Sequence, residues 1–127
     1  MFTTLEIMRM ANALATHSGS RVGVIAENIA NADTPGFRAR DLPDFETTWA
    51  DSEGKGMRAT RPGHIGTLPT VQVAAPIQRD GPGAPNGNTV SLQDEMVRAA
   101  QSRQDHDMAL AIYKNAADIL RAALGRR

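Results

Sequence analysis

The chain has 127 residues, within the usual size of one domain, and its 14 basic and 14 acidic residues give a formal net charge of zero. This balance argues against a nucleic-acid or anionic-membrane binder, which would show a basic stripe. Aromatic residues make up only 4% of the chain, so little hydrophobic area per residue is available for a core. Because cysteine is absent, disulfides and thiolate metal sites are excluded.

The N-terminal segment, Met1 to Asn12, does not read as a secretory signal. It contains an arginine and a glutamate, and its apolar residues are interrupted. No run in the sequence approaches the roughly 18 apolar residues of a membrane span. We therefore expect neither a cleaved signal peptide nor a membrane anchor, so any work outside the cytoplasm would need another export route.

Residues 1–33 predict a long helix with a narrow apolar seam. Its weak point is the segment 18–23, where Gly19 and Gly23 each cost about 1 kcal/mol relative to alanine. Two interpretations stay open: the helix breaks or kinks near Gly19, or the two glycines mark a close approach by another backbone. The seam repeats every seven residues at Met8, Ala15, Val22 and Ile29, with Ala11, Ser18, Ile25 and Ala32 three residues after each.

A proline and a glycine end this helix. Pro35 disfavours the α conformation for the residue before it, so the helix must end by about Asp33. The segment 34–37 has proline at the second and glycine at the third position of a type II turn, which requires a positive φ at Gly36. Asn28 and Asn31 share one face of the last helical turn, where their side chains can reach the free carbonyls of the helix end or a neighbouring chain.

Between Arg38 and Asn88 the helical pattern is lost, and every proline except Pro35 lies here. The region is either a small extended subdomain or a mobile linker. Residues 70–77 alternate with period two at Val71, Val73, Ala75 and Ile77, but Pro76 allows an edge strand at best. Phe37, Phe45 and Trp49 are large enough to anchor the region by folding back onto a helix. Residues 78–88, rich in glycine and proline, are expected to be flexible.

Residues 91–127 predict a second long helix without an internal proline. Ser91 and Asp94 approximate a capping box, and Gly125 is a natural stop after the last apolar residue. Some thirty helical residues would span about 45–50 Å. Alternating steps of four and three mark a seam with a polar centre, at Leu92, Met96, Ala99, Arg103, His106, Leu110, Tyr113, Ala117, Leu120 and Leu124.

No catalytic or metal-binding pattern is present in the sequence. His17, His64 and His106 are scattered, and the acids on either side of His106 diverge around a helix, so they cannot converge on one metal ion. The segment 54–56 lacks the spacing and setting of a phosphate-binding loop. Serine, threonine and lysine remain as nucleophiles, but none has an identifiable base. We expect no enzyme activity, no cofactor and no small-molecule substrate.

The helix-ending stretch resembles the signature of the flagellar rod, hook and filament-axial proteins. The residues that follow it, Arg38 to Asp41 and then Asp44-Phe45, are similar to those of the flagellar basal-body rod protein family, nearest its proximal members. The run 87–96 and the segment 62–65, with His64 in a structural role, also look like segments of these proteins. The matching motif residues are Asn28, Ile29, Asn31, Thr34, Pro35, Gly36, Phe37, Arg40 and Asp41.

The resemblance implies a mainly α fold and a structural role. Residues 1–33 and 91–127 would pair as an inner coiled-coil layer, and 34–90 would form the turn and an irregular middle with room for a short β segment. Such proteins are exported by the flagellar type III apparatus without a cleaved signal and assemble in the periplasm. The partners implied are other copies of the chain, other rod proteins, the adaptor FliE, the membrane ring and the export apparatus. The role that the resemblance implies for the chain is to transmit torque for motility.

The thin seams point independently to burial between chains. We do not expect two helices with so few large residues to offset their ordering entropy within one molecule, so order should be linked to assembly. A soluble helical adaptor or export chaperone for rod components is the alternative interpretation. The residues expected to pack between subunits are Met8, Ala15, Val22, Ile25, Ile29, Leu92, Met96, Leu110, Tyr113, Ala117, Leu120 and Leu124.

Overall fold

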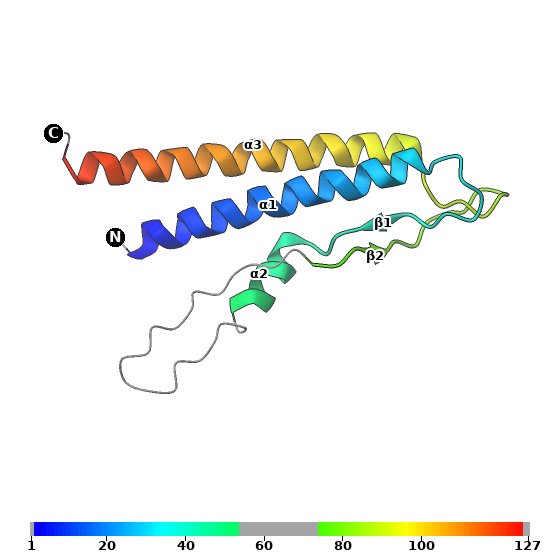
Figure 1. Cartoon of the computed structure of the whole chain (residues 1–127), viewed down its shortest axis with the longest axis horizontal. Coiled ribbons are helices and arrows are strands. Elements are labelled where there is room, and N and C mark those ends of the chain that lie inside the picture. The colour runs from blue at the N-terminus through cyan, green and yellow to red at the C-terminus, as the bar shows by residue number, and fades with distance from the viewer. Residues whose placement is uncertain (1, 54–73, 126–127) are drawn as a thin grey trace, which may run out of the picture.

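A helical hairpin dominates the computed structural model, which describes residues 2–53 and 74–125. The first and last helices lie side by side and antiparallel, and the chain between them folds back beneath the first helix (Figure 1). We call the segments 38–53 and 74–90 the arm. The mainly helical fold with paired terminal helices and a short middle sheet is confirmed. In chain order the elements of the described part are α1 (Phe2–Ala30), β1 (Arg40–Asp41), α2 (Phe45–Glu53), β2 (Ile77–Gln78) and α3 (Leu92–Ala123).

Helix α1 runs without a break through both of its glycines. The interpretation that it breaks near Gly19 is therefore wrong. A Cβ atom added to Gly19 or Gly23 would meet nothing within 4 Å, so no other backbone of the described residues approaches them. Both glycines face open space in the single chain, and the close approach that the sequence suggested is not made within it.

The turn after α1 has the predicted geometry. Gly36 has a φ of 74°, and the N–H of Phe37 donates to the carbonyl of Thr34 at 3.3 Å. Proline before a glycine with positive φ is the chemistry of a type II turn. The turn directs the chain away from α1 and into the arm, which runs back along the hairpin (Figure 1).

Helix α3 has the predicted start and stop. The Ser91 hydroxyl accepts a hydrogen bond from the N–H of Asp94 at 3.4 Å, as an N-cap does. At the other end, Gly125 has a φ of 75° immediately after the cap residue Leu124. With 32 residues, α3 is about 48 Å long.

Helix α2 was not expected from the sequence, which shows no helical pattern between Arg38 and Asn88. It spans only nine residues, and Phe45 and Trp49 lie four apart on one face, with ring centroids 5.9 Å from each other. These rings meet α1: Phe45 makes an edge contact with His17 at 5.7 Å, and the Arg9 guanidinium lies 5.0 Å from the Trp49 ring centre. Phe45 and Trp49 therefore anchor the arm on α1.

The short sheet includes only a small part of the strand that the period-two alternation of residues 70–77 predicted. Strands β1 and β2 pair antiparallel, with Arg40 opposite Gln78 and Asp41 opposite Ile77. Val71 and Val73 lie outside the described residues, so the first half of the predicted strand is not part of this description. Within the described half, Ile77 is the residue of the predicted strand that joins the ladder.

The segment 78–88, expected to be flexible, makes backbone hydrogen bonds to residues 36 and 39. The N–H of Arg79 donates to Ala39 at 2.8 Å, and the N–H of Gly36 donates to Asn86 at 3.0 Å. Directly after this segment, the N–H of Thr89 donates to Phe37 at 3.1 Å. These backbone partners lie 40 to 52 residues away, which composition alone does not show, and the flexibility of the segment stays a prediction.

The layer buried between α1 and α3 consists mainly of small side chains. In α3 it lies beside the predicted seam, because the larger apolar residues of that seam are directed to the flank. Small side chains let two helices approach closely but bury little area. The fully or nearly buried positions recur every seven residues, at Ala11, Ser18 and Ile25 in α1 and at Glu95, Ser102, Ala109 and Ala116 in α3.

Candidate functional site: a polar clamp and an exposed helical face

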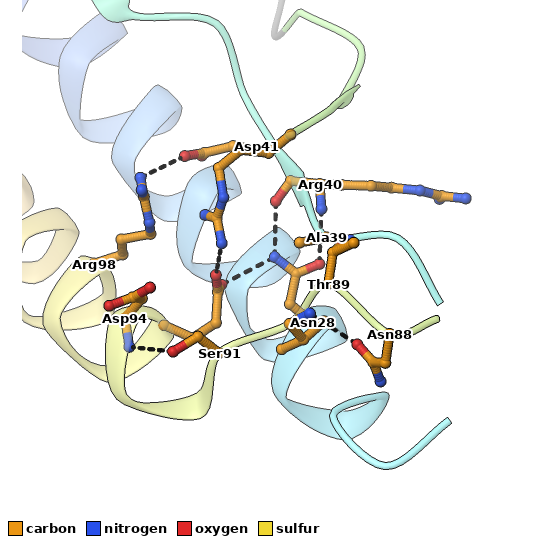
Figure 2. A network of polar contacts seen from close by, with 12 residues as sticks. Asn28, Ala39, Arg40, Asp41, Asn88, Thr89, Ser91, Asp94 and Arg98 are labelled. Atoms are coloured by element: carbon orange, nitrogen blue, oxygen red, sulfur yellow. Dashed lines mark hydrogen bonds and ion pairs between the residues drawn. The ribbon is translucent and has the colours of Figure 1, made fainter. Parts of the chain in front are cut away.

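Asn28 joins the three parts of the molecule at the end of α1. Its side chain is fully buried, and its Nδ2 donates to the carbonyl of Arg40 at 2.7 Å and to Oε2 of Glu95 at 2.9 Å. Its Oδ1 accepts the N–H of Arg40 at 3.0 Å, so it pairs with β1 as a strand neighbour would (Figure 2). The expectation that Asn28 reaches the free carbonyls of the helix end is therefore wrong.

Asn88 takes the role that the sequence suggested for Asn28. Its Nδ2 lies 2.7–3.0 Å from the carbonyl oxygens of Asn31, Ala32 and Thr34 and donates to them. Its Oδ1 accepts the N–H of Val90 at 2.8 Å. One buried amide thus satisfies carbonyls of the turn that follows α1 and fixes the chain just before α3. Asn88 was part of a recognised motif, but nothing local to it shows which carbonyls it meets.

Asp41 in β1 is held by one arginine from each long helix. Arg21 of α1 binds it through both oxygens, at 2.8 Å each. Arg98 of α3 donates to Oδ2 at 3.2 Å (Figure 2). Burial raises the pKa of Asp41, but the hydrogen bonds from Arg21 and the Leu42 N–H, with the arginine charges, outweigh it and leave that pKa below its usual value. The bond to Asp41 also raises the pKa of Arg21.

Glu95 in the first turn of α3 is the buried counterpart of Asp41. Its side chain has no exposed surface, and its Oε1 accepts a 2.6 Å hydrogen bond from Arg79 of the arm. Its other oxygen accepts the bond from Asn28. A buried carboxylate needs such partners, because an unpaired charge would carry a large desolvation cost. We call the connected group the clamp; its members are Arg21, Asn28, Asp41, Arg79, Glu95 and Arg98.

The remaining motif residues lie outside the clamp. In the turn, Thr34, Pro35 and Gly36 are exposed and Phe37 is half-buried, whereas Ile29 lies in α1 and is 37% exposed. The four turn residues shape the turn rather than enter the clamp.

Asn31 and Arg40 make surface contacts through their side chains. The Asn31 Nδ2 donates to the carbonyl of Glu27 at 2.8 Å, so it is the residue whose side chain meets a helix-end carbonyl as predicted. The Arg40 guanidinium lies 3.5 Å from the Glu27 carboxylate in a solvent-exposed pair. Arg40 therefore contributes to the clamp region through its backbone, not through its charge.

One side of the hairpin faces away from the arm and carries most of the residues expected to pack between subunits. On each helix these residues lie next to the stripe of buried residues, on one flank of it. In an antiparallel pair of helices these two flanks fall on the same side of the hairpin. Met8, Ala15, Ala117 and Leu120 are half-buried. We call this surface the free face; its exposed members, at 37% to 75% of their area, are Val22, Ile29, Leu92, Met96, Leu110, Tyr113 and Leu124.

Ile25 does not belong to the free face. It is only 1% exposed and fills the layer between α1 and α3. A neighbouring chain would find almost no surface of this side chain to contact. Ile25, which was expected to pack between subunits, therefore belongs to the core of the single chain.

The histidines and acids of the described residues form no cluster. His17 is buried and donates from Nε2 to the carbonyl of Pro43 at 2.8 Å, while His106 lies 3.7 Å from its neighbour Asp107. His64 lies outside the described residues. Within residues 2–53 and 74–125 no group of three potential ligands is placed to hold a metal ion. In the same residues, no helix combines the length and apolar character that a bilayer crossing requires.

Comparison with known proteins places these features in one family. A family model described as flagella basal body rod protein matches residues 11–38, which include the end of α1 and the turn. The flagellar basal body rod protein FlgB of Agrobacterium fabrum is 30% identical over 116 residues, which cover 87% of both chains. FlgB of Aeromonas hydrophila is 32% identical, over 77% of this chain and 76% of its own. FlgB of Escherichia coli K12 is 34% identical over 72% of each chain. The chain therefore belongs to the flagellar basal body rod protein family, alongside its FlgB members, as a structural component of the basal-body rod.

Proposed function

We propose that this chain is a proximal rod subunit that assembles in the periplasm with copies of itself and with other rod proteins. In this role it joins the membrane ring and export gate to the rest of the rod and transmits torque to the hook. Residues 1–33 and 91–127 form the inner coiled-coil layer of the assembly, and 34–90 form its outer part. The adaptor FliE and further rod subunits are its neighbours, and export proceeds through the flagellar type III apparatus without a cleaved signal.

The free face is the observation that carries this proposal. The arm covers one side of the hairpin, while the opposite side exposes large apolar residues such as Leu110 at 49% and Tyr113 at 43%. Burying a large apolar side chain contributes roughly 1.5–3 kcal/mol. Several such residues along two helices favour lateral association with other helices, whereas the small residues between α1 and α3 contribute little.

Introducing a charge on the apolar free face tests the proposal. Leu110→Asp adds a charge where the single chain is exposed, so the free energy of unfolding of the dilute chain should change by no more than about 0.5 kcal/mol. In an assembly the same charge would be buried without a partner, at a cost of several kcal/mol per subunit. We expect normal expression, loss of the chain from purified basal bodies and loss of swimming.

Gln101→Asp is the matched control, because Gln101 is exposed on the same helix but on the side away from the free face. It should leave basal bodies and swimming intact. Normal swimming of the Leu110→Asp strain would contradict assembly through the free face. If the wild-type chain were a stable cytoplasmic dimer absent from purified basal bodies, the export-chaperone interpretation would replace the rod subunit.

A further inference from the structure

The clamp links three separate parts of the molecule, and each of its central polar groups contacts both other parts. Asp41 belongs to the arm and is bonded to Arg21 of α1 and to Arg98 of α3. The two arginines approach one carboxylate from two helices. If α1 and α3 moved apart, Asp41 would lose at least one of these bonds.

Glu95 and Asn28 likewise each contact the two parts of the molecule to which they do not belong. Glu95 belongs to α3 and is bonded to Asn28 of α1 and to Arg79 of the arm. Asn28 belongs to α1 and is bonded to Glu95 of α3 and to the backbone of Arg40 in the arm. Figure 2 shows Asn28, Asp41 and Arg98 lying close together where α1, β1 and α3 meet.

We propose that the clamp couples docking of the arm to pairing of the two long helices, so that the arm is held less firmly on α1 when α1 and α3 separate. Glu95 is fully buried and the Asp41 side chain is only 11% exposed, so neither can exchange its partners for water without opening the structure. The outer part of the subunit thereby responds to the pairing state of its helices. This inference concerns the single chain and does not depend on how the chain assembles.

Amide hydrogen exchange on the full chain provides the test. The N–H of Arg40 is bonded to Asn28 and the N–H of Arg79 to Ala39, so their exchange rates report whether the arm is in place. Ala109→Asp puts a charge in the buried layer of α3, 14 residues after Glu95. We expect this substitution to accelerate exchange at both arm amides by about tenfold or more, together with the amides of α3.

Ala111→Asp is the matched control, because Ala111 is exposed on the same helix and receives the same charge. It should leave the arm amides as protected as in the wild type. Adding Arg98→Met should reduce the response of Arg40 and Arg79 to Ala109→Asp, because the bond from α3 to Asp41 is then absent, whereas Arg98→Lys should largely retain the response.

Three results would overturn the coupling. The arm amides could stay protected while α3 opens in Ala109→Asp, they could respond equally to Ala111→Asp, or their response could be unchanged by Arg98→Met. If Ala109→Asp does not fold, Ala109→Gly weakens the same layer without a charge and is judged by the same criteria.

Discussion

The two ends of the hairpin are held by different chemistry. Where α1 turns into the arm, the buried groups include Asn28 and Glu95, and their contact is the one side-chain hydrogen bond that joins α1 to α3 among the described residues. Towards the chain termini the layer between α1 and α3 contains Ala11, Ala109 and Ala116. One end is fixed by directional bonds, and the other by the fit of small side chains.

This difference separates specificity from adaptability. Hydrogen bonds between buried polar groups tolerate one geometry, since a displaced partner leaves a desolvated charge or amide unpaired. Layers of alanine and serine accept small shifts at little cost, because they contain few directional contacts. The polar end therefore sets how the arm leaves the hairpin, while the termini remain able to adjust to neighbouring helices.

The largest effect is expected at the polar end, from Glu95→Ala. This substitution removes the carboxylate that pairs with Arg79 and one of the two acceptors of the buried Asn28 amide, and it should lower the free energy of unfolding by about 3–5 kcal/mol. Urea unfolding followed by far-UV circular dichroism measures it. Asp118→Ala removes an exposed acid from the same helix, paired with Arg121 at the surface, and should change stability by less than about 1 kcal/mol. Equal losses in both variants would remove the distinction between the two ends.

A smaller loss is expected from Gly36→Val in the turn that leads to the polar end. Valine at a φ of 74° is strained, and such strain costs about 1–3 kcal/mol. Gly19→Ala is the contrasting variant, because its helix has room for a Cβ and should gain up to about 1 kcal/mol. Thermal unfolding of both variants gives the comparison. A Gly36→Val protein as stable as the wild type would show that the turn is not constrained by its neighbours.

The polar end should also respond to acid. The pKa of Asp41 is lowered in the folded chain, so its contribution to stability is complete above the ordinary value of 3.8 and is lost as the pH falls through the lower folded value. Asp41→Asn should therefore flatten the part of the pH dependence of unfolding that lies below about pH 4. An unchanged acid response in Asp41→Asn would assign the loss to other carboxylates.

Local chemistry in the sequence was sufficient for the caps, the type II turn and the long helices. A proline before a glycine, or a serine three residues before an acid, acts over one turn of chain and can be recognised without knowing the fold. The partner of Glu95 lies 67 residues away in Asn28, and no local pattern identifies it. Helix α2 was missed for a related reason, because its nine residues are stabilised by contacts of Phe45 and Trp49 with α1.

The candidate surface was predictable only in part. The seven-residue repeat identified the flank that carries Leu110 and Tyr113, but hydrophobicity alone assigned Ile25 to the same surface. In the structure Ile25 completes the layer that contains the small residues, where a larger side chain fills the space near the polar end. Which of two adjacent stripes faces the partner helix depends on contacts between residues far apart in the sequence, such as Asn28 with Glu95, which no local pattern shows.

The smallest expected effect comes from Ser102, in the same buried layer as Glu95 and seven residues after it. Its hydroxyl is buried and has no hydrogen-bond partner within the described part of the chain. Ser102→Ala removes an unsatisfied polar group and favours the helix, so it should raise the free energy of unfolding by up to about 1 kcal/mol. Both variants are measured in the same urea series. If the free energy of unfolding falls in Glu95→Ala and rises in Ser102→Ala, polar groups in this layer stabilise the chain only where they have partners. A loss of stability in Ser102→Ala would instead place a polar contact beyond the clamp and weaken the contrast between the two ends.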